Sequence, residues 1–309
     1  MAGPGVGIIG AGGVGVATAS ALIMRGLAGR VTVYARDGGA ARGLALDFMH
    51  ARPLLAHVEV RGRSLDEIER EDILVITAGA HTTPGQTRLD VLQKNIEVMD
   101  SVATAIESAA ALPRVALVVT NPLDVMTEYL TRRWIDEPVS VMGSGTALET
   151  LRLTDAVARE CGVHPRSVHA WVVGEHGDSC VFLLGSATVG NIPLLEFAQQ
   201  RGIRLHDDGL RAIEHDVRTA AYQVRDLKGA SVQGIGLTVS GLVHALVHEV
   251  GALIPVSTRV DDGLCASLPC VLGPDGPSAP LWPSMAPDER SAWDRSIAVL
   301  AEANKLLPI

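Results

Sequence analysis

The sequence predicts an α/β fold, in which a doubly wound parallel sheet is followed by a second, α+β domain. Short β-branched runs alternate with helical patterns through the first half of the 309 residues. Such alternation is typical of a parallel sheet covered by helices on both faces. A glycine-rich turn follows the first of these runs, and the rhythm changes after residue 143. Because the chain is also long for one core, we expect two domains, at residues 1–143 and 144–309.

Apolar, β-branched runs mark the buried strands of the first domain. In chain order they are Val6–Ile9, Val31–Tyr34, Ile73–Thr77, Val115–Thr120 and Val139–Met142. Helical periodicity fills the segments between them, most clearly at Leu89–Ala111. Right-handed crossover connections then favour the doubly wound arrangement.

The second domain mixes helices and strands. Its predicted elements are a helix at Ala147–Cys161, a strand at Val168–Val173, a hairpin-like region at Val181–Ile192, helices at Gly209–Asp226 and Val232–Glu249, and strands at Leu253–Val260 and Ser267–Leu272. Prolines between Pro274 and Pro287 indicate an irregular stretch before a closing helix that ends near Leu306.

Composition narrows the classes of partner. The formal net charge is −9 and the cationic residues form no stripe, which argues against nucleic acid and anionic membranes as partners. The four cysteines form no CxxC pair, which favours buried thiols in a reduced compartment. The apolar N-terminus lacks a charged leader, and no apolar run is long enough to span a bilayer. We therefore expect a soluble, cytoplasmic protein.

The segment GAGGVG, residues 10–15, follows the first predicted strand and opens a predicted helix. Gly10 would permit a tight turn, Gly12 would let the backbone approach a pyrophosphate, and Gly15 would let the helix pack closely on the strand. The helix N-terminus would attract the phosphates. Glycine-rich turns are common, but this strand–turn–helix context favours a Rossmann-type dinucleotide site over a merely structural turn.

A histidine between glycines is the leading catalytic candidate. His176 lies in the segment GEHGDS, residues 174–179, after an apolar predicted strand. A lone histidine is more often a satisfied structural residue. This one falls where a second domain should meet the cofactor, and an ordinary pKa of about 6.5 suits reversible proton transfer at neutral pH.

Other polar residues follow the carboxyl ends of predicted strands, where open α/β sheets bind ligands. The loop that ends at Arg88 comes after the strand end Thr77-Ala78-Gly79, and Asn121 ends another strand. Glu149 and Arg152 lie three residues apart on one helical face. Taken singly, the two arginines are typical of solvated surface residues, and Glu149 with Arg152 could be a plain helix ion pair.

Together these segments resemble the L-lactate/L-malate dehydrogenase family, nearly from end to end. The matching segments are GAGGVG, ITAGA, PGQTRLDVLQKNI, VTNPLDV, GSGTALETLR, HPRSVHAWVVGEHGDS and KGAS. The resemblance implies a nicotinamide-dependent oxidoreductase that moves a hydride to or from carbon 2 of a small L-2-hydroxy acid. It also implies a homodimer or a homotetramer.

The resemblance gives each catalytic candidate a role. Arg152 would hold the substrate carboxylate with two parallel hydrogen bonds, and Arg88 would polarise the carbonyl from a closing loop. His176 would take the hydroxyl proton in oxidation and return it in reduction. Asn121 would contact the reacting oxygen or the nearby cofactor. The family usually orients its histidine with an aspartate, and Glu149 stands in that place here.

The resemblance also implies the cofactor site. An acidic residue usually ends the second strand and hydrogen-bonds the adenosine ribose, but Ala35 falls in its place, followed by Arg36. Loss of the carboxylate removes repulsion against a 2′-phosphate, and Arg36 offers a bidentate partner, so NADP(H) is favoured over NAD(H). In the alternative, Asp37 takes the ribose and Arg36 lies over the adenine. The full cofactor set is Gly10, Gly12, Val14, Gly15, Ala35, Arg36, Thr77, Ala78, Gly79 and Asn121.

Substrate choice in the family depends on a loop residue six positions before the loop arginine. Counting back from Arg88 gives Thr82, where lactate enzymes usually have glutamine and malate enzymes arginine. A smaller, uncharged residue predicts an L-2-hydroxy acid with a medium, uncharged side chain, and Ser231 would form part of the pocket wall. An ordinary L-lactate or L-malate dehydrogenase is the alternative, since Ala220 and Ala221 match narrow-specificity lactate enzymes.

Two other classes of function remain open, a NAD-dependent hydrolase and a non-catalytic binding protein on the same fold. The hydrolase would need a metal near the nicotinamide. His244 and His248 lie one helical turn apart, but a third ligand is not apparent nearby, so no metal is expected. The joint presence of all four catalytic candidates argues against a non-catalytic protein.

Overall fold

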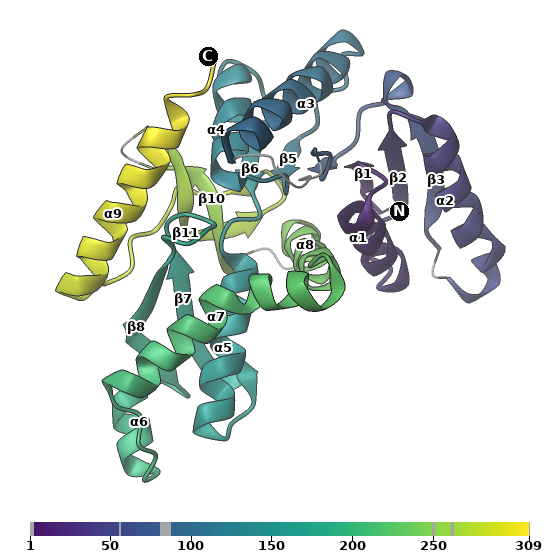
Figure 1. Ribbon diagram of the computed structural model, residues 1–309. Helices are drawn as coiled ribbons and strands as arrows, with labels where there is room; N and C mark the ends of the chain where they lie inside the picture. The colour runs from purple at the N-terminus through teal and green to yellow at the C-terminus, as the bar shows by residue number, and fades with distance from the viewer. Residues whose placement is uncertain (1–2, 56, 81–87, 249–250, 261–262, 309) are drawn as a thin grey trace.

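The fold is built on a nine-stranded sheet (Figure 1). The computed structural model describes residues 3–55, 57–80, 88–248, 251–260 and 263–308, without the side chains of residues 88–90 and 207. The strands of the first half are β1 (Gly5–Ile9), β2 (Arg30–Ala35), β3 (Glu59–Ser64), β4 (Ile73–Ile76), β5 (Val115–Val118) and β6 (Ser140–Gly143). They pair in parallel in the order β6-β5-β4-β1-β2-β3. The order reverses between β1 and β4, and ligands of open α/β sheets bind at such a switch point.

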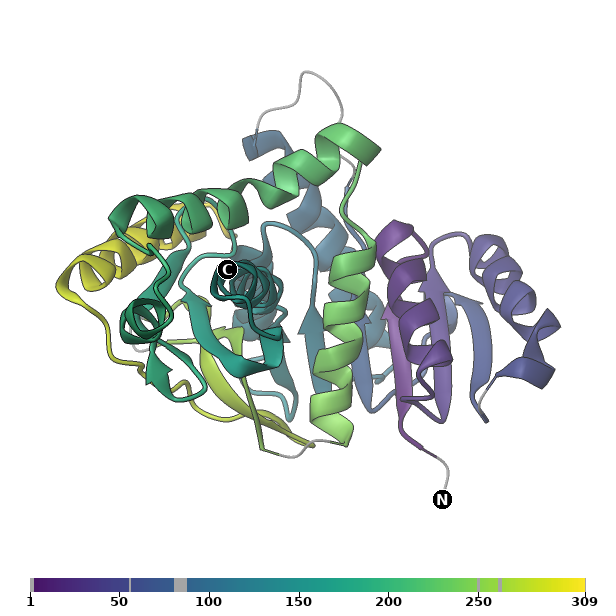
Figure 2. The same cartoon turned by 90° about the horizontal axis from the view of Figure 1, so that it is seen from below.

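Helices cover both faces of this sheet. They are α1 (Gly13–Met24), α2 (Gly38–His50), α3 (Arg88–Ser108), α4 (Leu123–Arg133) and α8 (Gln233–Val247). Successive side chains of a strand point to opposite faces. Ile8 accordingly packs in one core with α1, α2 and α8, whereas Ile9 packs in another with α3 and α4. Helix α8 comes late in the chain, yet it lies beside α1 in both ribbon views (Figures 1 and 2).

The second half builds a smaller layer beside the main sheet (Figure 2). Its elements are α5 (Ala147–Cys161), β7 (Val168–Val173), β8 (Val181–Val189), β9 (Ile192–Pro193), α6 (Leu194–Gln200), α7 (Asp207–Lys228) and α9 (Pro287–Asn304). Strands β7, β8 and β9 form an antiparallel sheet, and α5, α6 and α7 share its hydrophobic core. Short 3-10 turns occur at Arg52–Leu54, Leu65–Glu67 and Pro165–Ser167.

The predicted fold class is confirmed, and two features were not predicted. Strand β3, with the sequence EVRGRS, lacks an apolar run because it is the edge strand beyond β2. The late strands β10 (Ala252–Arg259), β11 (Cys265–Gly273) and β12 (Gly276–Pro277) extend the main sheet beyond β6 in antiparallel fashion, so both halves of the chain share one sheet.

The structure also describes the lengths and polarity of the helices and the environment of the cysteine thiols. Each helix within the described ranges is too short or too polar to cross a lipid bilayer. All four cysteines are buried free thiols, with Cys265 and Cys270 in the core beside β10.

Candidate active site

The glycine turn between β1 and α1 fits a dinucleotide. Gly10 has a φ of +121°, which L side chains rarely adopt, and its N–H donates to the Tyr34 carbonyl at 2.8 Å. A Cβ at Gly15 would lie 1.8 Å from the Gly10 carbonyl oxygen, so only glycine allows this close helix–strand approach. A Cβ at Gly12 would meet no described atom within 4 Å, which leaves room for a pyrophosphate at the N-terminus of α1. Val14 packs against the core instead.

The end of β2 lies beside this turn. Ala35 is half-buried there, and Arg36 and Asp37 are exposed. The Asp37 carboxylate caps α2, because its Oδ1 accepts a hydrogen bond of 2.9 Å from the Gly39 N–H. The second carboxylate oxygen, Oδ2, is not used by this capping hydrogen bond.

The carboxyl ends of β4 and β5 are joined by a residue that the sequence patterns did not single out. Asn95 of α3 is buried, and its amide accepts from the Ala80 N–H and donates to the Asn121 carbonyl, both at 2.6 Å. Thr77 follows β4, and its hydroxyl donates to the Ile9 carbonyl at 3.0 Å. Asn121 is exposed and lies at the sheet edge where the glycine turn also ends. The predicted cofactor residues of the two strand ends are therefore brought together.

The loop of residues 174–179, here called the histidine loop, is held in place by hydrogen bonds to β11 and α4. Gly174 pairs with Ser267 of β11 through two backbone hydrogen bonds of 2.9 Å. The backbone N–H of His176 donates to Asp124 Oδ2 at 2.7 Å, and the Ser257 hydroxyl donates to Asp124 Oδ1 at 2.6 Å. Burial raises the pKa of Asp124 to about 6, although these hydrogen bonds act to lower it. Asp124 lies in the first turn of α4.

His176, Glu149 and Arg152 form a continuous line of charges. His176 Nδ1 lies 3.1 Å from Glu149 Oε2, and Arg152 Nη1 donates to Glu149 Oε1 at 3.2 Å. Burial acts to lower the pKa of His176, but the Glu149 carboxylate outweighs it and raises that pKa to about 9. Burial likewise acts to raise the pKa of Glu149, and the charges of His176 and Arg152 lower it overall. The Glu149 carboxylate therefore favours the protonated, proton-donating form of the imidazole.

This line of charges borders a cavity of about 180 Å³ between α5, the histidine loop and α7. Arg218 of α7 lines it, and its Nη1 donates to the carbonyls of Asp178 and Cys180. Tyr222, one turn further along α7, donates to Asp178 Oδ1 at 2.6 Å. Arg218 and Tyr222 were not among the predicted residues, although their spacing of four on a long amphipathic helix places them on one face. Arg152 and Arg218 thus bring two cationic side chains to the lining of this cavity, together with the carboxylates of Glu149 and Asp178.

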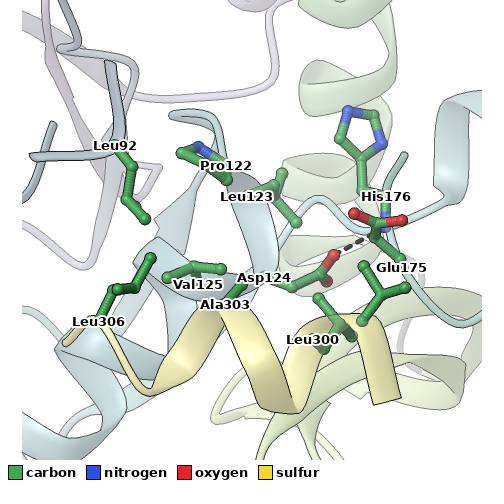
Figure 3. Close-up of a pocket in the computed structure, with 11 residues that line it drawn as sticks. Leu92, Pro122, Leu123, Asp124, Val125, Glu175, His176, Leu300, Ala303 and Leu306 are labelled. Atoms are coloured by element: carbon green, nitrogen blue, oxygen red, sulfur yellow. Dashed lines mark hydrogen bonds between the residues drawn. The ribbon is translucent and has the colours of Figure 1, made fainter. Parts of the chain in front are cut away.

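A second cavity, of about 260 Å³, shares His176 with the first (Figure 3). Figure 3 shows the His176 ring turned away from Asp124, whose carboxylate points to the His176 backbone. Besides His176, Asp124 and Glu175, the residues that line this second cavity are apolar, among them Leu300 and Leu306. The first cavity, with its arginines, is therefore the candidate substrate site.

The remaining predicted residues are placed only in part. Ser231 lies half-buried between α7 and α8, and the next residue, Val232, is so close to the glycine turn that a Cβ at Gly13 would lie 2.9 Å from it. Arg88 begins α3, but its side chain, like the whole of Thr82, lies outside the described residues. Within the described part of the chain, no group of three or more His, Cys, Asp or Glu side chains is placed to hold a metal ion.

Comparisons with known proteins cover nearly the whole chain. A family model described as "lactate/malate dehydrogenase, NAD binding domain" matches residues 5–143, and one described as "lactate/malate dehydrogenase, alpha/beta C-terminal domain" matches residues 146–306. An L-lactate dehydrogenase of Thermus aquaticus is 40% identical over 98% of this chain and 99% of its own length. One of Chloroherpeton thalassium is 36% identical over 96% and 98%.

A solved structure agrees with these matches. The minor L-lactate dehydrogenase from Enterococcus mundtii, in a ligands-bound form, superimposes with a TM-score of 0.92 and covers 100% of both chains, at 28% identity.

Proposed function

The chain belongs to the lactate/malate dehydrogenase family, and from that premise we propose that it interconverts small 2-oxo acids and L-2-hydroxy acids. It is a lactate dehydrogenase-like oxidoreductase with a nicotinamide cofactor. The observation that carries the proposal is the arrangement of His176 and Arg152 on one buried carboxylate, Glu149. A proton donor and a cation for an acid substrate thus border the same cavity.

The proposed mechanism follows from these side chains. Arg152 binds the substrate carboxylate and fixes which face of carbon 2 is presented to the cofactor. A nicotinamide dinucleotide, which the glycine turn at residues 10–15 and the carboxyl ends of β4 and β5 would hold, would supply or accept the hydride at carbon 2. In reduction, His176 donates its proton to the developing alkoxide, and in oxidation it removes the hydroxyl proton. Arg88 polarises the carbonyl, and Asn121 contacts the reacting oxygen or the cofactor.

We also propose that NADP(H) is preferred over NAD(H). The matched domain is described as NAD binding, so this proposal is argued only from residues 35–37 of this chain. Ala35 brings no carboxylate to repel a 2′-phosphate, the exposed Arg36 can pair with it, and Asp37 is engaged in capping α2.

The proposed substrate has a medium, uncharged side chain. The resemblance to the family places the uncharged Thr82 at the position that selects the substrate side chain, so a second substrate carboxylate would lack a charged partner from this residue, a mismatch that corresponds to about 10²-fold discrimination or more. Arg218, which lines the cavity, is held by the carbonyls of Asp178 and Cys180, which limits its reach.

We further propose a cytoplasmic homodimer or homotetramer. Large apolar side chains are exposed on helices of both halves of the chain, among them Leu46 of α2, Leu151 of α5 and Leu237 of α8, each more than half exposed. The four buried free thiols are compatible with a reducing compartment.

One experiment tests the proposal: a matrix of 2-oxo acids against NADH and NADPH, followed by the absorbance of the reduced nicotinamide. We expect turnover of neutral 2-oxo acids with NADPH as the better cofactor. Absence of oxidation of either cofactor with any 2-oxo acid would contradict the proposed activity and revive the hydrolase or non-catalytic alternative. Best efficiency with pyruvate or oxaloacetate and NADH would instead indicate an ordinary lactate or malate dehydrogenase.

A further inference from the structure

The last helix, α9, meets the histidine loop at one fully buried serine. The Oγ of Ser296 accepts a hydrogen bond of 2.8 Å from the Glu175 N–H, and it lies 3.1 Å from the Oγ of Ser179. A Cβ at Gly174 would lie 2.6 Å from the same Oγ, so a side chain at that position would displace it. One hydroxyl of α9 thus contacts the histidine loop on both sides of His176.

These contacts belong to a closed ring of hydrogen bonds. The Ser179 hydroxyl donates to Glu175 Oε2 at 2.5 Å, so its single proton is not available to Ser296. Across the 3.1 Å contact between the two hydroxyls, Ser296 is therefore the donor and Ser179 the acceptor. The ring leaves Glu175 at its N–H, passes through both hydroxyls and returns to the carboxylate of the same residue. Hydrogen bonds in such a chain polarise and strengthen one another.

Three consecutive backbone N–H groups of the histidine loop donate to three different elements. Those of residues 174, 175 and 176 donate to the carbonyl of Ser267 in β11 at 2.9 Å, to Ser296 of α9 at 2.8 Å, and to Asp124 of α4 at 2.7 Å. The backbone from Gly174 to His176 is thereby fixed relative to all three elements. Ser296 accepts the central one of these hydrogen bonds, next to the residue that carries the imidazole.

We propose that Ser296 is a positioning residue for His176: the ring that it completes holds the loop backbone so that the imidazole stays against Glu149. The inference rests on the proposed function and deepens it, because it assigns to α9 a residue on which proton transfer depends. Ser296 itself does not line the candidate substrate cavity. Its effect on the reaction is therefore indirect, through the 3.1 Å contact between His176 Nδ1 and Glu149 Oε2.

Helix α9 is attached to the rest of the molecule without this hydroxyl. Apolar side chains of α9, such as that of Trp293, are buried in a core that the helix shares with β8 and β11. A helical serine commonly donates its hydroxyl to a carbonyl one turn earlier, as Ser291 of α9 does. Ser296 instead directs its hydroxyl to the histidine loop, which favours a role in the placement of the histidine over a role in the stability of the helix.

The variant Ser296→Ala removes the hydroxyl and keeps the Cβ. The Glu175 N–H and the Ser179 oxygen then each lose a partner, and the loop backbone is free to shift. We expect kcat for a 2-oxo acid to fall by about 10- to 10²-fold, the range for a small displacement of a catalytic group. The dissociation constant of the reduced cofactor should stay the same, because the glycine turn is formed by β1 and α1. Ser291→Ala, which changes an exposed serine of the same helix, is the matched control and should keep the wild-type kcat.

A second readout reports directly on the imidazole. Burial and the charge of Arg152 act to lower the pKa of His176, whereas Glu149 of α5 and Asp124 of α4 act to raise it. Displacement of the imidazole from Glu149 weakens the main raising interaction, so in Ser296→Ala the kcat/KM for the 2-oxo acid should begin to fall at a lower pH than in the wild type. A purely structural serine would change only the free energy of unfolding. Unchanged kcat and an unchanged pH profile in Ser296→Ala would therefore overturn the proposal.

The variant Ser179→Ala tests the ring from its other side. Because Ser179 and Ser296 belong to one ring, we expect each single variant to lower kcat to a similar degree, and the double variant to lower it little further. Losses that multiply in the double variant would show two independent effects and would contradict the ring. Absence of turnover in the wild type would contradict the proposed function itself, whereas normal wild-type turnover with the same kcat in Ser296→Ala would defeat this inference alone.

Discussion

The backbone N–H of His176 donates a 2.7 Å hydrogen bond to the carboxylate of Asp124, 52 positions earlier in the chain. The same carboxylate accepts from Ser257 of β10 at 2.6 Å. A buried carboxyl with a pKa near 6 is therefore the junction of α4, β10 and the histidine loop. Asp124 does not touch the substrate cavity, so it acts as a positioning residue for His176.

The first prediction concerns the stability that Asp124 confers at different pH. Its pKa is raised from 3.8 to about 6, so the folded state holds the proton more tightly than the unfolded state. Lowering the pH from 7 to 5 should therefore stabilise the wild type relative to Asp124→Asn, by about 1 kcal/mol. Denaturant unfolding of both proteins at several pH values measures this difference. A difference that stays constant between pH 7 and 5 would contradict the assigned protonation of Asp124.

The second prediction is that His176 is the acid–base catalyst. Replacing it with asparagine removes the proton donor and should lower kcat by roughly 10²–10⁴-fold, with little change in fold or in cofactor affinity. The exposed His215 of α7 provides a matched control, since His215→Asn should keep normal turnover. Near-normal turnover of His176→Asn would remove this residue from the mechanism.

The third prediction is the pH dependence of the reaction. Reduction needs the protonated imidazole, so kcat/KM for a 2-oxo acid should be level below about pH 9, the pKa of His176, and fall above it. Oxidation of the hydroxy acid needs the neutral imidazole and should rise up to the same pH. In Glu149→Gln the falling limb should move to lower pH, because the carboxylate that raises the pKa is gone. A limb that does not move would separate this titration from His176.

Most of the fold, and the polar residues that lie in local motifs, could be predicted from the sequence. The buried parallel strands, the glycine turn and His176 follow from short patterns, because each depends on residues next to it in the chain. Asn95 and Asp124 could not be predicted in this way, since their partners lie 26 and 52 positions away in the sequence. Strand β3 was missed for another reason, because an edge strand needs few apolar residues.

The fourth prediction concerns the choice of cofactor. Arg36→Ala should reduce kcat/KM with NADPH by about 10-fold or more, the usual range for a charged hydrogen-bonding partner, and leave NADH nearly unaffected. Ala35→Asp should act in the opposite direction, because a carboxylate at the end of β2 would bind the ribose hydroxyls and repel a 2′-phosphate. Steady-state kinetics with both cofactors decide this point. A clear NADH preference of the wild type would defeat the prediction.

The last prediction addresses the substrate side chain. An arginine at position 82 would give a second substrate carboxylate the partner that Thr82 lacks, so Thr82→Arg should raise kcat/KM for oxaloacetate more than for any neutral 2-oxo acid. The panel would include pyruvate, 2-oxobutyrate, 2-oxoisocaproate and phenylpyruvate. The adjacent Thr83 offers a matched control, because Thr83→Arg adds the same charge one position along the chain. An equal gain in both variants would reflect general attraction of a dianion to a more cationic surface. Highest efficiency of the wild type with oxaloacetate would show that another group already pairs the second carboxylate, and the argument from Thr82 would then be wrong.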